Sequence, residues 1–195
     1  MNPMLQATVL TRLRLETRDQ HDAVERTLRL MDDDLSCDDY RHRLQRFYGY
    51  YKPVEERIFS HGSPLAEWLT LRHRIKTPWL KADLIALGRQ EVAQLPVCGS
   101  LPPLRRIADY FGCMYVLEGA TLGAVLINRH VQQKLGIMPQ SGGQFFNGYG
   151  KRTGAMWLEF RNALTAFALM TDEQDAIVLS ARVTFRTLQQ WCEEE

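Results

Sequence analysis

A long apolar stretch, free of proline between Pro103 and Pro139, constrains the fold of this chain more than any other feature. Its length favours a helix, because strands rarely exceed about ten residues. The stretch nevertheless contains glycines at positions 112, 119 and 123. An interior helical glycine costs about 1 kcal/mol relative to alanine. At 3.6 residues per turn the three glycines share one face, so the helix presents a bare stripe that something flat can approach closely.

The side of this helix opposite the glycines is also apolar, through Leu117, Thr121 and Val125. We therefore expect the helix to be buried nearly all round. Two explanations of the glycine stripe follow. It could mark a close crossing of two helices, or it could leave room for a flat ligand. The glycines alone do not decide between them.

The rest of the chain shows helical periodicity and no alternating strand pattern of useful length. This predicts an all-α fold of seven or eight helices in a single domain, residues 1–195. Ser36 with Asp39 predicts a helix start, and Thr171 is expected to cap the last helix. Pro53 predicts a kink or a break. The expected helices cover about 7–31, 36–60, a short segment from 64, 78–95, the stretch that follows 103, 156–170, and a last helix ending near 191.

Composition excludes several classes of protein. The chain is 45% hydrophobic and 24% charged, which is typical of a globular domain. Its net charge of +1 gives no electrostatic reason to bind nucleic acid or a membrane surface. No run of about eighteen consecutive apolar residues suggests a membrane span, and charges near the N-terminus argue against a signal peptide. The four cysteines form no Cys-x-x-Cys pair, so we expect neither a disulfide framework nor a zinc site. Together these features predict a cytoplasmic protein.

Among five histidines, His21 differs because it continues the apolar stripe of the first predicted helix. Glu25 follows one turn later on the same face and could fix the imidazole tautomer. Arg14 precedes His21 by two turns, and it could pair with a carboxylate at the rim of a ligand held by His21. The alternatives stay open at this point: a hydrogen-bonded core histidine, and a solvated arginine.

Two segments carry a resemblance to a known family. The segment from Leu15 to Glu25, Leu-Glu-Thr-Arg-Asp-Gln-His-Asp-Ala-Val-Glu, resembles the proximal helix of haem oxygenases. The segment from Tyr115 to Arg129, which begins Tyr-Val-Leu-Glu-Gly, resembles their distal helix. Further matches cover 44–59, 145–160 and 180–191. The similarity spans nearly the whole chain and is greatest to the bacterial branch, including the enzymes that supply bacteriophytochromes.

The resemblance implies a role for several side chains. His21 would bind the haem iron as its proximal ligand, and Glu25 would support that histidine. Arg14 and Tyr115 would contact haem propionates. Phe185 would line the haem pocket from the last helix.

On the distal side, the resemblance places Gly119 and Gly123 directly over the haem plane as the catalytic backbone positions. Two departures from the family pattern stand out. Ala120 occupies the place of an aspartate that organises water in the mammalian-type enzymes. Leu158 falls where a lysine would reach the second propionate. The candidates to replace that lysine are Arg152 and Arg161.

The implied activity is oxidative cleavage of haem, as both cofactor and substrate, to biliverdin, carbon monoxide and ferrous iron with O2. Electrons would come from an external donor (a ferredoxin, a flavoprotein reductase or ascorbate), since no nucleotide-binding glycine motif is present. Arg129, His130 and Lys134 could dock that donor or simply be a solvated helix end. A bacteriophytochrome is a candidate acceptor of biliverdin.

Two other functions fit the same fold. One is a haem carrier without enzymatic activity. The other is a thiaminase-like enzyme, which requires a reactive cysteine in a polar pocket, and only Cys113 is suitably placed.

Overall fold

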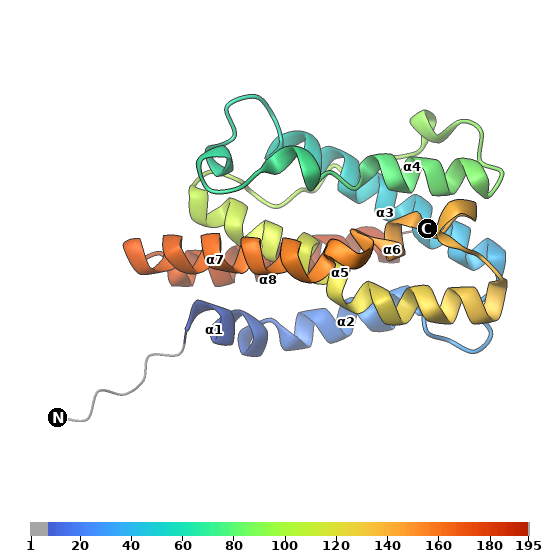
Figure 1. Cartoon of the computed structure of the whole chain (residues 1–195), viewed down its shortest axis with the longest axis horizontal. Helices are drawn as coiled ribbons and strands as arrows, with labels where there is room; N and C mark the ends of the chain where they lie inside the picture. The colour runs from blue at the N-terminus through green and yellow to red at the C-terminus, as the bar shows by residue number, and fades with distance from the viewer. Residues whose placement is uncertain (1–7, 195) are drawn as a thin grey trace.

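The computed structural model describes residues 8–194, and all regular structure in that range is helical (Figure 1). This confirms the predicted all-α fold. The α-helices are α1 (Val9–Glu16), α2 (Arg18–Leu28), α3 (Cys37–Ile58), α4 (Thr77–Ala86), α5 (Ile107–Leu135), α6 (Gln144–Asn147), α7 (Thr153–Met170) and α8 (Gln174–Glu193). Short 3-10 helices cover Pro64–Glu67, Leu71–His73, Val92–Gln94, Pro139–Ser141 and Gly150–Arg152.

The central helix α5 packs along α8 and also contacts α6 and α7. In Figure 1, α1 and α2 form one edge of the bundle, and α3 and α4 form the opposite edge. The second half of α5, in yellow, crosses towards the edge that α2 forms (Figure 1). Helix α8 contacts both α2 and α5, so it connects that edge to the core.

The first predicted helix is two helices, because the chain changes direction at Thr17. This residue has φ −109° and ψ 5°, and its hydroxyl donates a 2.7 Å hydrogen bond to the Leu13 carbonyl. Met31, at the end of the first predicted helix, lies after α2 and is 53% exposed. The predicted start at residue 7 lies outside the described residues.

Helix α3 begins at the predicted capping box of Ser36 and Asp39 and runs through Pro53 without a break. Proline lacks the N–H that would bond the carbonyl four residues earlier, which is that of Gly49. The Cys98 N–H donates to this carbonyl instead, at 2.9 Å. The carbonyl that Pro53 leaves free is therefore satisfied by a distant loop, and the helix continues without the predicted break.

Three other helix boundaries differ from those predicted. Helix α4 ends at Ala86 rather than near Leu95, because Gly88 adopts a left-handed φ of +86°. Helix α5 begins at Ile107, four residues after Pro103. Thr171 does not cap α8; it ends α7, and its hydroxyl donates to the Phe167 carbonyl at 3.0 Å.

Of the three glycines in α5, Gly112 serves a helix crossing. A Cβ atom at this position would lie 2.3 Å from the Ile177 carbonyl oxygen and 2.9 Å from the Ala181 nitrogen, both in α8. Among the described helices, α5 is also the one long and apolar enough to span a membrane by length and composition alone. The core helices of soluble proteins meet the same criterion, and half of the apolar window of α5 is buried within the bundle.

We predict that Gly112→Ala lowers the free energy of unfolding by about 1–3 kcal/mol, because the added methyl group forces α5 and α8 apart. Denaturant unfolding followed by circular dichroism measures the change. Gly154→Ala is the matched control in α7, where a Cβ atom meets nothing within 4 Å. It should leave stability unchanged or raise it by up to about 1 kcal/mol. Equal effects in the two variants would contradict the crossing.

Candidate functional site

Two groups of contacts hold α5 beside α1 and α2. At one end, Tyr115 lies against Thr17 and Arg14: burial raises the Tyr115 pKa, while the Thr17 hydroxyl and the Arg14 charge oppose that rise. At the other end, His130 Nε2 lies 3.0 Å from the Asp32 carbonyl oxygen. The two contacts are fifteen residues apart in both segments, 115 to 130 and 17 to 32. The helices therefore run in the same direction for roughly 20 Å.

This register brings the predicted proximal and distal residues to matching heights. His21 lies four residues beyond Thr17, and Gly119 lies four residues beyond Tyr115. Glu25 and Gly123 follow one turn later on their respective helices. The pairs that the resemblance places on either side of one ligand thus lie opposite each other.

His21 lies at the rim of the bundle, not inside it. Its side chain is 52% exposed, whereas Val24 and Leu28 form the buried face of α2, so the predicted place of His21 on the inward stripe is wrong. The imidazole contacts the Phe185 ring edge-on, with centroids 5.7 Å apart. A side chain on α2 can reach a ligand only if it lies outside the packed face of the helix, and His21 lies there.

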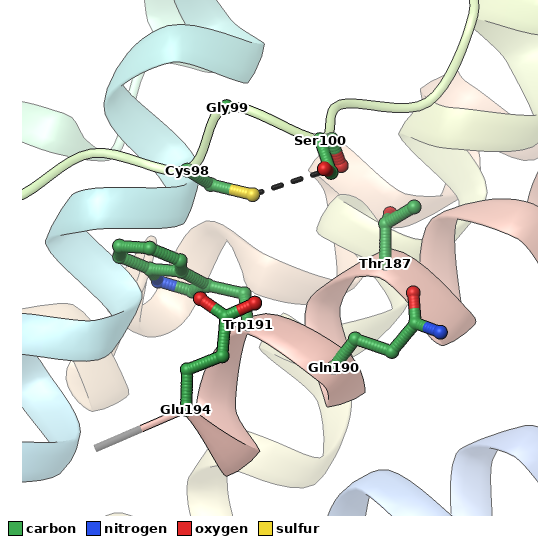
Figure 2. Close-up of a pocket in the computed structure, with 7 residues that line it drawn as sticks. All are labelled: Cys98, Gly99, Ser100, Thr187, Gln190, Trp191 and Glu194. Atoms are coloured by element: carbon green, nitrogen blue, oxygen red, sulfur yellow. Dashed lines mark hydrogen bonds between the residues drawn. The ribbon is translucent and has the colours of Figure 1, made fainter.

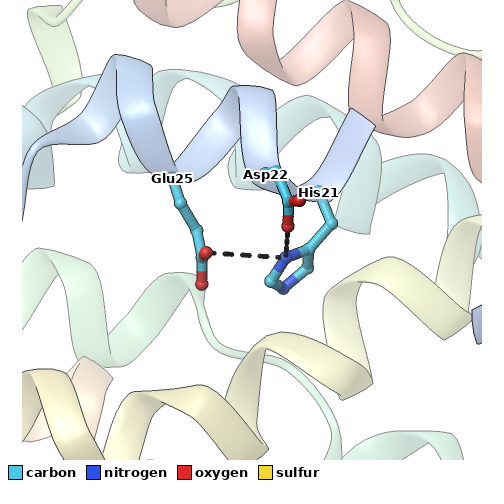
Figure 3. Close-up of side chains that lie close together, drawn as sticks. All are labelled: His21, Asp22 and Glu25. Carbon is cyan, nitrogen blue, oxygen red and sulfur yellow. Dashed lines mark ion pairs between the residues drawn. The ribbon is translucent and has the colours of Figure 1, made fainter. Parts of the chain in front are cut away.

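The two nitrogens of the His21 ring have different surroundings. Nδ1 lies 3.7 Å from carboxylate oxygens of both Asp22 and Glu25 (Figure 3). These distances are too long for direct hydrogen bonds, but they favour an N–H at Nδ1. Nε2 is then the unprotonated nitrogen that can bind a metal.

The face of α5 around Gly119 and Gly123 is bare. A Cβ atom at Gly119 would meet only Trp157 Cη2, at 4.0 Å, and one at Gly123 would meet nothing within 4 Å. Protein packing among the described residues therefore does not require these two glycines. They differ in this respect from Gly112, although all three share one helical face.

Leu122 and Leu126 flank the bare glycines and are 42% and 61% exposed. Val125, on the side of the helix away from the glycines, is 54% exposed. Our expectation that this helix is buried nearly all round is therefore wrong, because its second half packs into the core through only one side, which includes Thr121 and Ala124. The exposed side would be covered by a large flat apolar ligand.

These features together fit haem. An imidazole nitrogen, an opposing backbone without side chains and an apolar strip suit a planar iron macrocycle. Arg14 and Tyr115 lie at one end of the strip, where a cation and a phenol suit an anionic edge group. Arg161 and Leu158 of α7 are exposed, so Arg161 is available as a second cation.

Arg152 lies elsewhere. It lines a cavity of about 370 Å³ with the segment before α4 and the loop after α6. A second cavity, of about 300 Å³, lies between Cys98, Ser100 and the end of α8 (Figure 2). Of the residues predicted for the haem site, only Arg152 lines either cavity, so the predicted site is an open face rather than an enclosed pocket.

Cys113 has the opposite environment to a reactive thiol. It is fully buried in α5, and burial raises its pKa to about 12. A thiol with such a pKa is hardly ionised near neutral pH and is a poor nucleophile. The thiaminase-like alternative thus loses the one cysteine on which it depended.

A buried charged cluster lies directly behind the bare strip and was not predicted from the sequence. The Glu118 carboxylate is fully buried and binds Arg74 at 2.5 Å and Lys76 at 2.6 Å. The Tyr149 hydroxyl donates to the same carboxylate at 2.8 Å. The available signal was a single acidic residue in the apolar stretch next to Gly119, but its partners are too distant in sequence to be identified from it.

We predict that Gly119→Ala and Gly123→Ala each raise the free energy of unfolding of the ligand-free protein by up to about 1 kcal/mol, because alanine favours the helix and its methyl group meets no clash. Thermal unfolding without added ligand measures this. Destabilisation comparable to that of Gly112→Ala would show that these glycines also serve protein packing.

Comparisons with known proteins agree with this geometry. The family model described as heme oxygenase matches residues 7–194. A haem oxygenase of Xanthomonas campestris pv. campestris (strain 8004) is 28% identical over 106 residues, which cover 51% of this chain and 57% of that protein. The match therefore spans little more than half the length of this relative.

Two solved structures share the fold. The haem oxygenase of Neisseria meningitidis superposes with a TM-score of 0.78 at 21% identity, covering 96% of this chain and 94% of that chain. The haem oxygenase of Leptospira interrogans gives a TM-score of 0.77 at 18% identity, covering 96% of this chain and all of that chain. At these identities the superpositions establish the fold, and the family model establishes the family. The chain is a member of the haem oxygenase family.

Proposed function

We propose that this chain is a haem oxygenase that cleaves haem to biliverdin, carbon monoxide and ferrous iron, using O2 and electrons from an external donor. Membership of the family supports the proposal. The observation that carries it is the placement of an exposed imidazole, that of His21, at the height of two glycines that packing does not require.

His21 would hold the haem iron through Nε2. The carboxylates of Asp22 and Glu25, 3.7 Å from Nδ1, favour the tautomer that leaves Nε2 unprotonated and limit rotation of the ring. Phe185 packs against the ring edge and restricts it from the other side. A neutral imidazole lacks the electron push of a thiolate ligand, which favours cleavage of the O–O bond.

Gly119 and Gly123 form the proposed distal roof. When bound, haem would supply both the redox-active iron that activates O2 and the carbon that is oxidised. The bare backbone allows the macrocycle to lie close to α5 and restricts the space above the iron. Leu122 and Leu126, beside the glycines, would exclude water from its faces and edges. Ala120 offers no acid or base, so water in the distal pocket would be held by other groups.

Arg14 and Tyr115 are the proposed contacts of one propionate, and Arg161 is the candidate for the other. Since Leu158 replaces the expected lysine, the angle at which haem sits depends on this second contact. That angle determines which meso carbon faces the restricted space, and so which biliverdin isomer forms.

The external donor would reach the haem edge. Lys134 is paired with Asp33 at 2.8 Å, and His130 bonds the Asp32 carbonyl, so these two residues hold the loop after α2. Arg129 and Lys134 are both exposed, and Arg129 is the residue that we propose for docking. The identity of the donor, a bacteriophytochrome as acceptor and a cytoplasmic location stay predictions.

Turnover distinguishes an oxygenase from a haem carrier. The protein loaded with haem and given O2 with ascorbate or a ferredoxin system should lose its Soret band and release a bile pigment identified by chromatography. A Soret band that persists through many equivalents of reductant supports the carrier function instead.

We predict that His21→Ala weakens haem binding by more than about tenfold, since even the loss of a supporting contact costs metal sites that much. Bile pigment formation should stop, while the far-UV helical signal survives because His21 is exposed. Titration with haem and single-turnover assays measure these effects. His42→Ala, an exposed histidine on α3, is the control and should behave as the unmodified protein. Unchanged turnover in His21→Ala without added imidazole would remove His21 from the site.

We predict that Gly119→Leu blocks haem binding without unfolding the protein. The longer side chain would occupy the space beside Trp157 where the macrocycle is proposed to lie. Gly154→Leu provides a control on the exposed start of α7. Unaltered haem affinity in Gly119→Leu would contradict the proposed roof.

A further inference from the structure

The buried cluster behind Gly119 joins three separate parts of the chain. Arg74 and Lys76 come from the segment that leads into α4, Glu118 from α5, and Tyr149 from the loop after α6. Arg74 and Glu118 are completely buried, and Lys76 is 2% exposed. Lys76 Nζ also donates to the Arg74 carbonyl at 3.1 Å, which holds the two cations in one arrangement.

Arg74 contacts two helices at once. One guanidinium nitrogen binds the Glu118 carboxylate, and the other donates to the Met156 carbonyl of α7 at 3.2 Å. Gly119 follows Glu118 in the sequence, and Trp157 follows Met156. These two residues are neighbours, because Trp157 Cη2 lies 4.0 Å from the Cβ position of Gly119. The cluster therefore fixes the two residues that border the proposed haem space on its distal side.

Burying the charged groups of this cluster costs free energy. Desolvation of ions costs several kcal/mol each, and apolar residues of similar volume often give equal stability. Arg74 also pairs with Glu159 of α7 at 3.3 Å, so the cluster places two cations between two carboxylates. Glu118 lies in the middle of α5, where backbone groups already bond one another, so it does not cap a helix.

A second buried carboxylate provides the contrast. Glu55 of α3 accepts hydrogen bonds from the Lys76 N–H at 2.8 Å and the Thr77 N–H at 2.9 Å, and so satisfies the start of α4. The hydrogen bonds at the start of α4 explain why the Glu55 carboxylate is buried. No helix start explains why the Glu118 carboxylate is buried. On the haem-facing side of α5, the Cβ position of Gly119 meets only Trp157 among the described residues, at 4.0 Å, so little packing holds the helix at a fixed height there.

We propose that Glu118 is a positioning residue that fixes the height of Gly119 over the haem, and that Arg74, Lys76 and Tyr149 hold it in place. The inference rests on the proposed function, because it assigns the cluster a role at the distal side of the haem site. A displacement of about 1 Å near reacting atoms is enough to lower a rate by up to about a hundredfold. A rigid connection to the opposite edge of the bundle provides the restraint that side-chain packing does not.

The test uses two variants that weaken the cluster without leaving an extra charge. Tyr149→Phe removes one hydrogen bond to Glu118. The double variant Glu118→Gln/Lys76→Met removes one charge of each sign, and its glutamine can still bond Arg74 and Tyr149. Glu55→Gln is the matched control, since it alters an equally buried carboxylate that does not bind α5. Two quantities are measured: the pH at which the ferric haem complex changes its absorption spectrum, and the ratio of bile-pigment isomers after turnover.

Both cluster variants should shift the midpoint pH of the ferric spectrum by at least about 0.3 unit, since the distance from the iron to the distal backbone changes. They should also alter the isomer ratio, with turnover reduced by about tenfold in the double variant. Glu55→Gln should leave the spectrum and the ratio unchanged even if the protein melts at a lower temperature. Cluster variants with the unmodified midpoint and ratio would overturn the inference, as would an equal shift in Glu55→Gln.

The proposed function is tested separately, by measuring haem binding and bile-pigment formation in the unmodified protein. If that protein binds haem but forms no bile pigment, the oxygenase proposal fails, and the ferric spectra of the variants still decide whether Glu118 positions the distal backbone. If Glu118→Gln/Lys76→Met does not fold, Tyr149→Phe, which alters no charge, decides alone.

Discussion

The structure depends on α5 being held firmly in the bundle while one side of its second half remains bare. Contacts at Tyr115 and at His130 hold the helix against the edge formed by α1 and α2. Between those contacts the side chains that would fill the space are missing or apolar. A helix in this position cannot rely on packing from that side, and the buried charges around Glu118 supply restraint from the other.

One face of one helix thus has two functions along its length. At Gly112 the missing side chain lets α8 approach to backbone contact, and at Gly119 and Gly123 it leaves the strip that we assign to haem. The two explanations of the glycine stripe that the sequence left open are therefore not exclusive. Spacing alone could not separate them, because glycines seven residues apart share a face whatever lies beyond it.

Much of the fold could be predicted from hydrophobic periodicity and capping signals, such as the box at Ser36 and Asp39 that begins α3. Errors arose where a distant contact overrides a local rule. Pro53 does not break α3, because the Cys98 N–H takes the carbonyl that the proline leaves free. His21 was expected on the buried face since it follows the apolar period, yet α2 is rotated so that Val24 and Leu28 face the core. The partners of Glu118 could not be predicted, because Arg74 and Tyr149 are more than thirty residues away in sequence on either side.

We propose that an iron macrocycle lies between the His21 imidazole and the bare backbone of α5. A crystal structure of the protein with ferric haem would show where the iron binds. We expect iron on His21 Nε2 and the distal face of the ring against Gly119 and Gly123. Iron bound by any other residue, or haem bound outside the space between α2 and α5, would contradict it.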